Sequence, residues 1–358
     1  MINKLKILII TNELLTTCGV SKHLLYFLSE AKKRDDIEFT ILCGGGDAID
    51  VYKDLCQEVF VNPAVKHENR SAANFIKAFF FLFRLLTKNK YQIIHSHNHY
   101  ADNIAKSVSY FVKVKTIQTV HGIIDPIGRL NHYPSNYFIA VNEHVEDYLL
   151  KQEKKSAKNV QLIRYGIPAP PICIKPIKQK LKVISAGRLI PQKGFDIYIE
   201  AISKLKKDTI DKSEFLIAGK GDYESELKKL AEKLNTSINF IGEIKDLISQ
   251  LIETHIFVIP TRSQNEGFPL TIIESALAQN LIISSNFLGY DSILKDKVNA
   301  LIFNVNDSND LANKLDYVIE NFKEMNEIIE RGYQDARNEF SLDKMINETI
   351  SFYKKILL

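Results

Sequence analysis

The segment IPTRSQNEGFPLTIIE, residues 259–274, indicates how the second half of this chain folds. It overlaps the apolar run HIFVIP, which is typical of a buried strand, and leads into LTIIESALAQ, whose apolar residues have helical spacing. The segment therefore predicts a strand, a loop and a helix. Pro269 suits the first turn of that helix, because proline has no N–H to leave unpaired there, and Gly267 lets the backbone approach a ligand closely.

The loop and the helix start in this segment have the chemistry of an anion site. Unpaired N–H groups at the positive end of a helix attract phosphate. Glu266 in the loop and Glu274 about one turn into the helix can accept hydrogen bonds from hydroxyl groups on either side of that phosphate. A phosphate flanked by two polyols describes a nucleotide sugar.

The string E-G-F-P-L-x-x-x-E resembles the signature of the family 4 retaining glycosyltransferases, which have the two-domain GT-B fold. The resemblance implies that Glu266 contacts the donor sugar and Glu274 the ribose. It also places the donor diphosphate at the helix end formed by Gly267, Phe268, Pro269 and Leu270. The alternative is that Glu266 is an ordinary loop residue and Glu274 a solvated helical one.

A second motif, SAGRLIPQKG at 185–194, follows the strand-like run LKVI and precedes a helical pattern. Arg188 and Lys193 are therefore expected at the carboxyl end of a strand, where open α/β sheets bind ligands. Both cations can neutralise a diphosphate. In the family that this chain resembles, the segment holds the diphosphate and stabilises the leaving nucleotide; taken alone, basic loop residues are usually solvated.

Two further segments resemble nucleotide-binding parts of the family. In FLIAGKGDY, 215–223, a buried strand runs into a turn where Gly219 permits close approach, although a plain strand-to-helix turn explains it almost as well. INFIGEI, 238–244, resembles the strand and turn over which the family lays the base, with backbone groups near Ile244 reading its edge. The base itself leaves no trace in the side chains, and a UDP-sugar is the expected donor.

The first half repeats the strand–helix alternation that predicts a doubly wound parallel sheet. Strands are expected at 6–11, 38–43, 91–97 and 116–122. The loop after the first strand keeps Gly19, which the resemblance places near the donor. Relatives commonly have two adjacent glycines there, whereas Cys18 occupies the other place in this chain.

Histidines end two of these strands. His121 closes the run T-V-H-G, and the resemblance implies that it touches the donor sugar; the alternative is a strand-end histidine that only caps a backbone carbonyl. His95, His97 and His99 would share one face if their strand extended that far. Three imidazoles on one face can bind zinc, but no Cys, Asp or Glu with ligand spacing accompanies them. An acceptor-site role for His97 or His99 is the other interpretation.

Length, composition and linkers predict the domain organisation. A chain of 358 residues suggests two domains. With the resemblance we expect an acceptor-side Rossmann-like domain at 1–168, a donor-side one at 169–340, facing it across a cleft, and a terminal helix at 341–358 that returns to the first domain. The break lies in the proline-rich stretch 166–178. Four cysteines without metal or disulfide spacing favour a reducing cytoplasm.

Charge and hydropathy bear on partners. A net charge of +4 with scattered lysines does not suit nucleic-acid binding. No run is apolar and long enough for a spanning helix. Residues 74–90 join a dense aromatic face to basic ends, which is typical of a helix lying on a membrane surface, here at the inner face. The alternative, which we favour, is a helix that covers the first sheet.

These observations together predict a retaining GT-B glycosyltransferase, of hexosyl or N-acetylhexosaminyl type, that moves a sugar to a saccharide or lipid-linked acceptor in cell-surface glycoconjugate synthesis. No Asp-x-Asp occurs, so we expect no metal and no other cofactor. The rival of another class is a non-catalytic GT-B subunit that binds a partner transferase. An epimerase or a phosphorylase could also share the fold, but a pyridoxal-dependent phosphorylase would be expected to be far longer.

Overall fold

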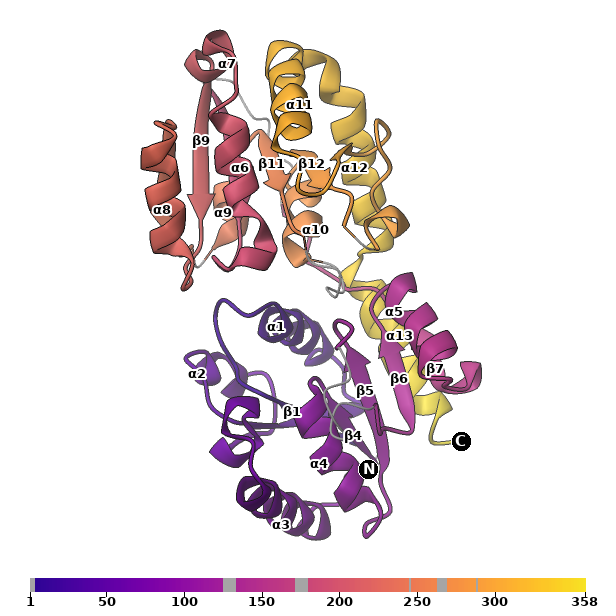
Figure 1. Ribbon diagram of the computed structural model, residues 1–358. Helices are drawn as coiled ribbons and strands as arrows, with labels where there is room; N and C mark the ends of the chain where they lie inside the picture. Colours follow the sequence, from indigo (N-terminus) through magenta and orange to yellow (C-terminus); the bar gives the residue numbers. More distant parts are fainter. Residues whose placement is uncertain (1–3, 125–132, 171–179, 245, 263–268, 288) are drawn as a thin grey trace. The chain divides into compact units, whose positions relative to one another are not determined.

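The computed structural model describes residues 4–124, 133–170, 180–244, 246–262, 269–287 and 289–358, and it contains two α/β units (Figure 1). The N-terminal unit consists mainly of Met1–Pro168 and Ser341–Leu358. The C-terminal unit consists of Ala169–Gln264 and Pro269–Phe340. Each unit has its own parallel sheet and its own apolar core, as expected for the predicted fold class.

The N-terminal sheet has the strand order β3-β2-β1-β4-β5-β6-β7, with all its pairs parallel. The order reverses between β1 and β4, which makes the sheet doubly wound. Its strands are β1 (Leu5–Thr11), β2 (Ile37–Cys43), β3 (Glu58–Val61), β4 (Ile93–Ser96), β5 (Lys115–Val120), β6 (Tyr137–Ala140) and β7 (Val160–Leu162).

Helices cover both faces of this sheet because alternate strand residues point to opposite sides. Ile7 and Ile9 of β1 pack with α1 (Gly19–Ala31), α2 (Ile49–Lys53) and α13 (Leu342–Lys355). Leu8 and Ile10 pack with α3 (Ala72–Lys88) and α4 (His99–Ser109) on the other face. The short helix α5 (Glu143–Asp147) lies beside β6 and β7.

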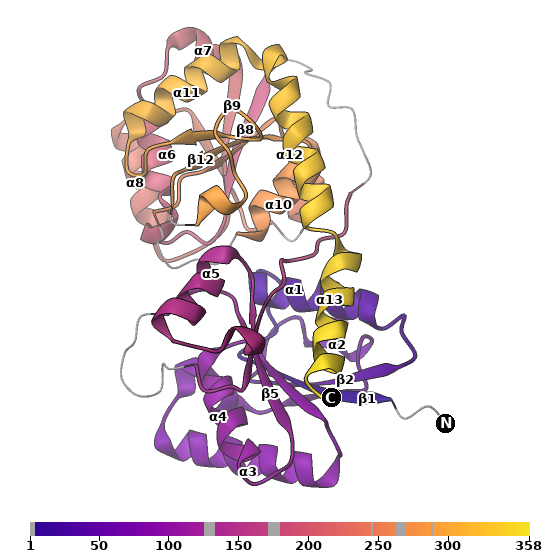
Figure 2. The same ribbon diagram turned by 90° about the vertical axis from the view of Figure 1, so that its right-hand side faces the viewer.

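The last helix packs on the first unit, as the family resemblance implied. Figure 2 shows α13 beside α1, and the Tyr353 hydroxyl is 2.6 Å from His95 Nδ1 at the centre of the sheet. Gly166 lies against the start of α13, where a Cβ atom would be 2.6 Å from Leu342 Cα. The glycine of the Tyr165–Gly166 pair is therefore required for this close approach.

The C-terminal sheet has the order β10-β9-β8-β11-β12-β13 and is also parallel. Its order reverses between β8 and β11. The strands are β8 (Leu181–Ala186), β9 (Ser213–Ala218), β10 (Ile238–Gly242), β11 (Ile256–Ile259), β12 (Leu281–Ser285) and β13 (Leu301–Phe303). The helices are α6 (Phe195–Ile202), α7 (Lys207–Asp211), α8 (Glu224–Lys233), α9 (Leu247–Ile252), α10 (Leu270–Leu277), α11 (Ser308–Glu320) and α12 (Asn326–Glu339).

Several element boundaries differ from the predictions. The strand expected at 116–122 ends at Val120, so His121 follows the strand and does not end it. The strand expected at 91–97 ends at Ser96, because Asn98 caps the next helix by accepting a hydrogen bond from the Ala101 N–H at 2.8 Å. Pro269 occupies the N-cap of α10 in an extended conformation, so it lies one residue before the first turn in which we expected it.

Candidate functional site

The predicted donor residues of the C-terminal unit lie in loops that are bonded to one another at the carboxyl edge of its sheet. The Leu189 N–H donates to Lys220 O at 3.0 Å, which joins the loops after β8 and β9. The Gly219 N–H donates to Gly242 O at 2.7 Å, and the Arg262 N–H donates to Gln192 O at 2.9 Å. These bonds give the site a fixed backbone floor.

Glycine is required where these loops touch. Gly219 has φ +135°, and a Cβ atom there would be 1.8 Å from Gly187 O. Gly194 has φ +68°, and its Cβ would be 2.0 Å from Pro260 O. The space that a side chain would need is therefore filled by the neighbouring loop, so Gly219 serves first to let two loops pack.

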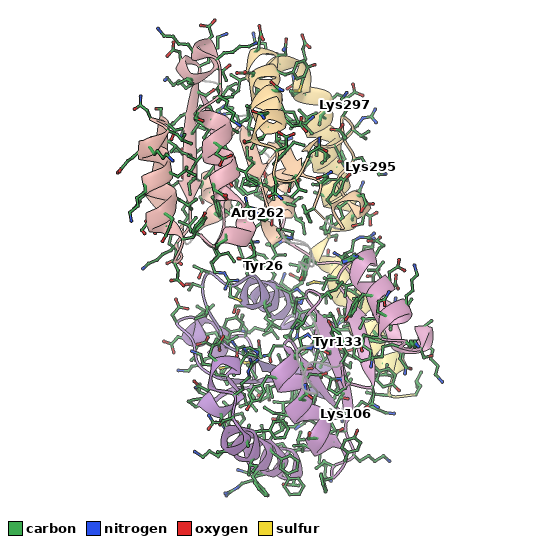
Figure 3. All side chains as sticks on the ribbon, in the orientation of Figure 1. Tyr26, Lys106, Tyr133, Arg262, Lys295 and Lys297 are labelled. Atoms are coloured by element: carbon green, nitrogen blue, oxygen red, sulfur yellow. The ribbon has the colours of Figure 1, made fainter. Side chains whose placement is uncertain are left out.

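The loop that carries the two predicted cations is held by a residue that the sequence reasoning missed. Arg262 donates to Pro191 O and to Asp196 Oδ2, both at 2.9 Å, and Figure 3 shows it in the C-terminal unit. Arg188 is exposed and Lys193 half-buried on this anchored loop. Arg262 lies inside the segment 259–274, but its partners come from residues about 70 positions earlier.

The second carboxylate of the signature is buried. Glu274 in α10 is 1% exposed. The alternative of a solvated helical glutamate is therefore wrong, since an ionised carboxylate is kept in such a place only by hydrogen bonds or charge. Leu270 begins the helix and is buried too. Ile244 is half-buried just beyond β10. Glu266, Gly267 and Phe268 lie outside the described residues.

In the N-terminal unit, three histidines meet at the point where the strand order reverses. His97 directly follows β4, and its N–H donates to Ile10 O of β1 at 3.0 Å. His121 directly follows β5, and its Nε2 is 2.9 Å from His97 Nδ1. The third is His23 of α1, whose ring centre is 5.8 Å from that of His97 and 5.3 Å from that of His121.

The tyrosine of the Tyr165–Gly166 pair orients His121. Its hydroxyl is 2.9 Å from His121 Nδ1, and the two rings are stacked with their centres 5.8 Å apart. No sequence pattern predicts a tyrosine at this place. The contact also shows that His121 does more than cap a backbone carbonyl.

Burial keeps these imidazoles neutral. Desolvation lowers the pKa of His23 to about 4. It also brings the pKa values of His97 and His121 well below the usual value for histidine, with smaller contributions from the neighbouring histidines. Neutral rings are ligands and hydrogen-bond partners rather than cations.

The idea that His95, His97 and His99 share one face is wrong, because the strand stops before His99. His99 is the first residue of α4, and its ring packs edge-on against Tyr133 with centres 4.6 Å apart. His95 Nε2 is 2.7 Å from Thr119 Oγ1, and with the Tyr353 contact both of its ring nitrogens are engaged.

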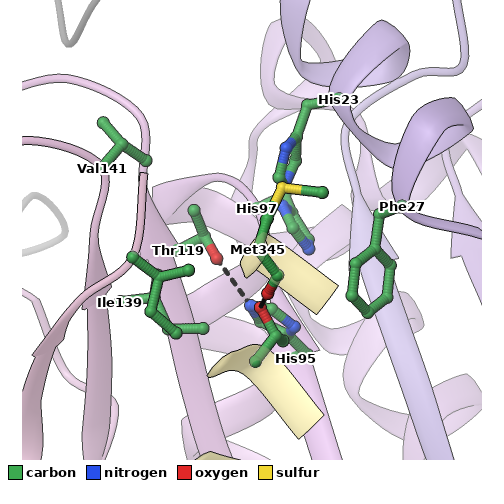
Figure 4. Close-up of a pocket in the computed structure, with 10 residues that line it drawn as sticks. His23, Phe27, His95, His97, Thr119, Ile139, Val141 and Met345 are labelled. Atoms are coloured by element: carbon green, nitrogen blue, oxygen red, sulfur yellow. Dashed lines mark hydrogen bonds between the residues drawn. The ribbon is translucent and has the colours of Figure 1, made fainter. Parts of the chain in front are cut away.

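A small cavity lies beside the histidines. It measures ≈ 10 Å³, which is room for about one water molecule. Figure 4 shows His23, His97 and His95 one below another along it, and Met345 of α13 also lines it. Gly19, the predicted donor contact of this unit, is the exposed first residue of α1, after an N-cap Cys18 whose side chain makes no capping bond.

Sequence families match both units. The family described as "Glycosyltransferase Family 4" matches residues 17–169, and the one described as "Glycosyl transferases group 1" matches residues 174–335. An Escherichia coli protein described as a UDP-Gal:alpha-D-GlcNAc-diphosphoundecaprenol alpha-1,3-galactosyltransferase is 22% identical over 354 residues, which cover 90% of each chain.

Solved structures share the fold. A glycosyltransferase from Rickettsia africae ESF-5 superposes with a TM-score of 0.84 at 20% identity, covering 99% of each chain. Anabaena Alr3699/HepE, determined in complex with UDP, has a TM-score of 0.81 at 16% identity and covers 98% of this chain and 100% of its own. At these identities the structures establish the fold alone.

Proposed function

Because this chain belongs to the family 4 glycosyltransferases of GT-B fold, we propose that it transfers a sugar from a UDP-sugar to a saccharide or glycolipid hydroxyl, with retention of anomeric configuration. Glycosyltransferase activity follows from the family. The donor base, the sugar type and the stereochemistry are the proposed part. The comparisons do not favour the alternative of a non-catalytic subunit.

The observation that carries the proposal is the bonded loop edge of the C-terminal unit. It presents Arg188 and Lys193 on a backbone anchored by Arg262, at the reversal of strand order where open α/β sheets bind ligands. Glu274 is built into the adjoining core rather than left in solvent. A pair of cations with a buried carboxylate suits a nucleoside diphosphate, which offers anionic oxygens and ribose hydroxyls.

The proposed mechanism is catalysis by positioned charge. Arg188 and Lys193 neutralise the charge that grows on the diphosphate as the bond to the sugar breaks, helped by the start of α10. Glu274 accepts hydrogen bonds from the ribose. His121 and Glu266 orient the sugar, a role that the family resemblance assigns to them. These charges do the work that a metal ion does in enzymes with an Asp-x-Asp pair, so activity without a divalent metal is expected.

The acceptor is proposed to be lipid-linked, and the outer surface of α3 supports this. One side of the helix packs on the sheet through residues such as Leu82, as the favoured alternative predicted. The opposite side exposes Ile76 and Phe80, the latter 63% exposed. Phe79 joins them to the end of α4, since its ring centre is 5.7 Å from that of the exposed Phe111.

Charge on this surface suits an anionic membrane. Residues 72–90 and 103–115 contain seven Lys and Arg and no Asp or Glu. Lys106, labelled in Figure 3, lies in this region, and its Nζ is 5.0 Å from the centre of the exposed Tyr110 ring. Exposed aromatic rings with basic side chains around them bind the headgroup region of anionic bilayers. None of the described helices is both long and apolar enough to cross a bilayer.

The donor is tested by nucleotide release from UDP-, GDP- and ADP-sugars in EDTA without acceptor, because slow hydrolysis identifies the donor alone. Release from UDP-sugars is the expected result. Release from another donor alone would replace UDP in the proposal, and release that occurs only when EDTA is replaced by a divalent metal would contradict the metal-free mechanism. If no donor is hydrolysed, the assay is repeated with total lipid extract as acceptor. Release of nucleotide would then show that an acceptor is required, and no release would favour a non-catalytic subunit.

Membrane contact is tested by flotation with vesicles that contain phosphatidylglycerol. The double change Phe80→Ser with Phe111→Ser should reduce binding at least tenfold, whereas Tyr317→Ser, at an exposed aromatic residue of α11, should not. Donor hydrolysis should be equal in both variants. Equal flotation of the two variants would remove this surface from the proposal.

A further inference from the structure

We propose that His23, His97 and His121 form a binding site for a divalent transition metal ion of the Zn²⁺ type. Each histidine offers one ring nitrogen, and the three nitrogens lie within 4.8 Å of one another. The ligands come from α1, from the end of β4 and from the end of β5, so the fold and not a local motif assembles them.

Unsatisfied nitrogens point to a missing ligand. His23 is 8% exposed and His97 4% exposed, yet His23 Nδ1 and His97 Nε2 have no hydrogen-bond partner within the part of the chain that the structure describes. Buried polar atoms are rarely left in this state, because each costs about 1–3 kcal/mol. A metal ion, or a water molecule in the adjoining cavity, would remove that cost.

The surroundings of His121 favour the metal over the water. Tyr165 engages Nδ1 of this ring at 2.9 Å, so the ion would take Nε2, which contacts His97 Nδ1 at 2.9 Å and would exchange that contact for the metal. Metal-binding histidines are usually held in this way, with the second nitrogen bonded to a neighbouring polar group. His121 is half-buried, less enclosed than His23 and His97, so an ion would reach the site from its side.

The ligand set selects the kind of metal. Neutral imidazoles suit zinc, copper, nickel and iron, whereas magnesium and calcium prefer oxygen ligands. Zinc–nitrogen bonds of about 2.0–2.1 Å bring tetrahedral ligands to roughly 3.3 Å from one another. The rings therefore have to close by about 1.5 Å at most. Three protein ligands leave the fourth position open to water or to an anion, as in catalytic zinc sites.

One consequence rests on the proposed function. If His121 orients the donor sugar, a metal ion that takes its Nε2 removes that contact, and zinc should inhibit transfer. This differs from the carboxylate-held metal that some glycosyltransferases use for the diphosphate, because here the metal opposes the reaction.

The test is calorimetric titration of untagged, full-length, EDTA-stripped protein with ZnCl₂. One zinc per chain is expected, with no heat from MgCl₂. His23→Gln should weaken zinc binding at least tenfold, and His67→Gln, at an exposed histidine of the same unit, should leave it unchanged. Equal affinity in His23→Gln, or no zinc binding by the unaltered protein, would overturn the site and leave a water in the cavity.

Two further measurements keep the outcome independent of folding and of activity. Titration of the unaltered protein with Co²⁺ should give the intense visible absorption of a tetrahedral site, and a weak octahedral spectrum would contradict it. Tyr165→Phe, which keeps the stacked ring but removes the hydroxyl, should weaken zinc binding about tenfold. Failure of zinc to inhibit, with binding intact, would overturn only the role of His121 in the donor site.

Discussion

The two units have the same kind of strand order but carry different side chains at the point where that order reverses. In the N-terminal sheet the strand order reverses between β1 and β4, and in the C-terminal sheet between β8 and β11. At the first reversal neutral imidazoles gather, and at the second the loops carry glycines, two cations and a nearby buried carboxylate. Eight of the nine histidines belong to residues 1–168. The topology thus provides the place, and short loop sequences decide what binds there.

The largest expected effect concerns the cations of the C-terminal unit. Lys193→Ala should lower kcat about 10²–10³-fold, because a positioned charge on the developing diphosphate is lost. Steady-state transfer with the identified donor measures it. Lys212→Ala removes an exposed lysine at the opposite, amino-terminal end of β9 and should leave kcat unchanged. Similar losses in both variants would mean that general charge, and not position, matters.

Glycine substitutions in the two units come next. Gly219→Ala should lower the free energy of unfolding by about 2–3 kcal/mol, because the new Cβ collides with Gly187 O and φ is positive. Gly166→Ala should have a similar cost by displacing the start of α13. Urea unfolding followed by pulse proteolysis assigns each loss to its unit. A loss in the wrong unit would contradict the assigned contacts.

Loss of the charge on the buried carboxylate should weaken nucleotide binding. Glu274→Gln keeps the volume of the side chain but weakens its hydrogen bonds to ribose, so the Kd of the nucleoside diphosphate should rise about tenfold, or ~1.4 kcal/mol. Calorimetry with the nucleotide gives the value. His99→Gln in the other unit is the control variant. An equal rise in its Kd for the nucleoside diphosphate would show that the effect does not depend on Glu274.

The pH dependence of stability separates the two units. In the folded chain burial holds the pKa of His99, like that of His23, at about 4, whereas unfolded histidines bind protons below about pH 6.5. The unfolded state therefore gains protons first as the pH falls. The free energy of unfolding of the N-terminal unit should drop between pH 6.5 and 4 by about 1.4 kcal/mol per pH unit for each such histidine.

Urea unfolding at pH 7 and pH 5 checks this prediction. His99→Phe keeps the ring contact with Tyr133 but cannot be protonated. It should reduce the pH dependence of the free energy of unfolding by the contribution of one histidine. The C-terminal unit carries one histidine. Histidine protonation can therefore change its free energy of unfolding by at most about 1.4 kcal/mol per pH unit. An equal pH dependence of the free energy of unfolding in the two units would contradict the assignment of the buried neutral histidines to the N-terminal unit.

The sequence by itself determined the elements and the family. Hydrophobic periodicity located the four strands expected in the first half of the chain within two residues, because it reflects burial of short local segments. It did not predict β3, β6, β12 or β13. The motif around Glu274 and the segment with Arg188 and Lys193 pointed to the same chemistry before any contact was known. Residue spacing could not end the strand at Ser96, since the cap by Asn98 competes with strand extension.

Only the tertiary structure decided which distant residues meet. Sheet order brings His23 of α1 to His97 and His121, and it places Tyr165 on His121, Arg262 on the loop at Pro191 and Tyr353 on His95. No local pattern encodes these pairs, because they arise when parallel strands from distant parts of the chain align their carboxyl ends. Burial, which makes the imidazoles neutral and encloses Glu274, is likewise a property of the packed unit and not of any segment within it.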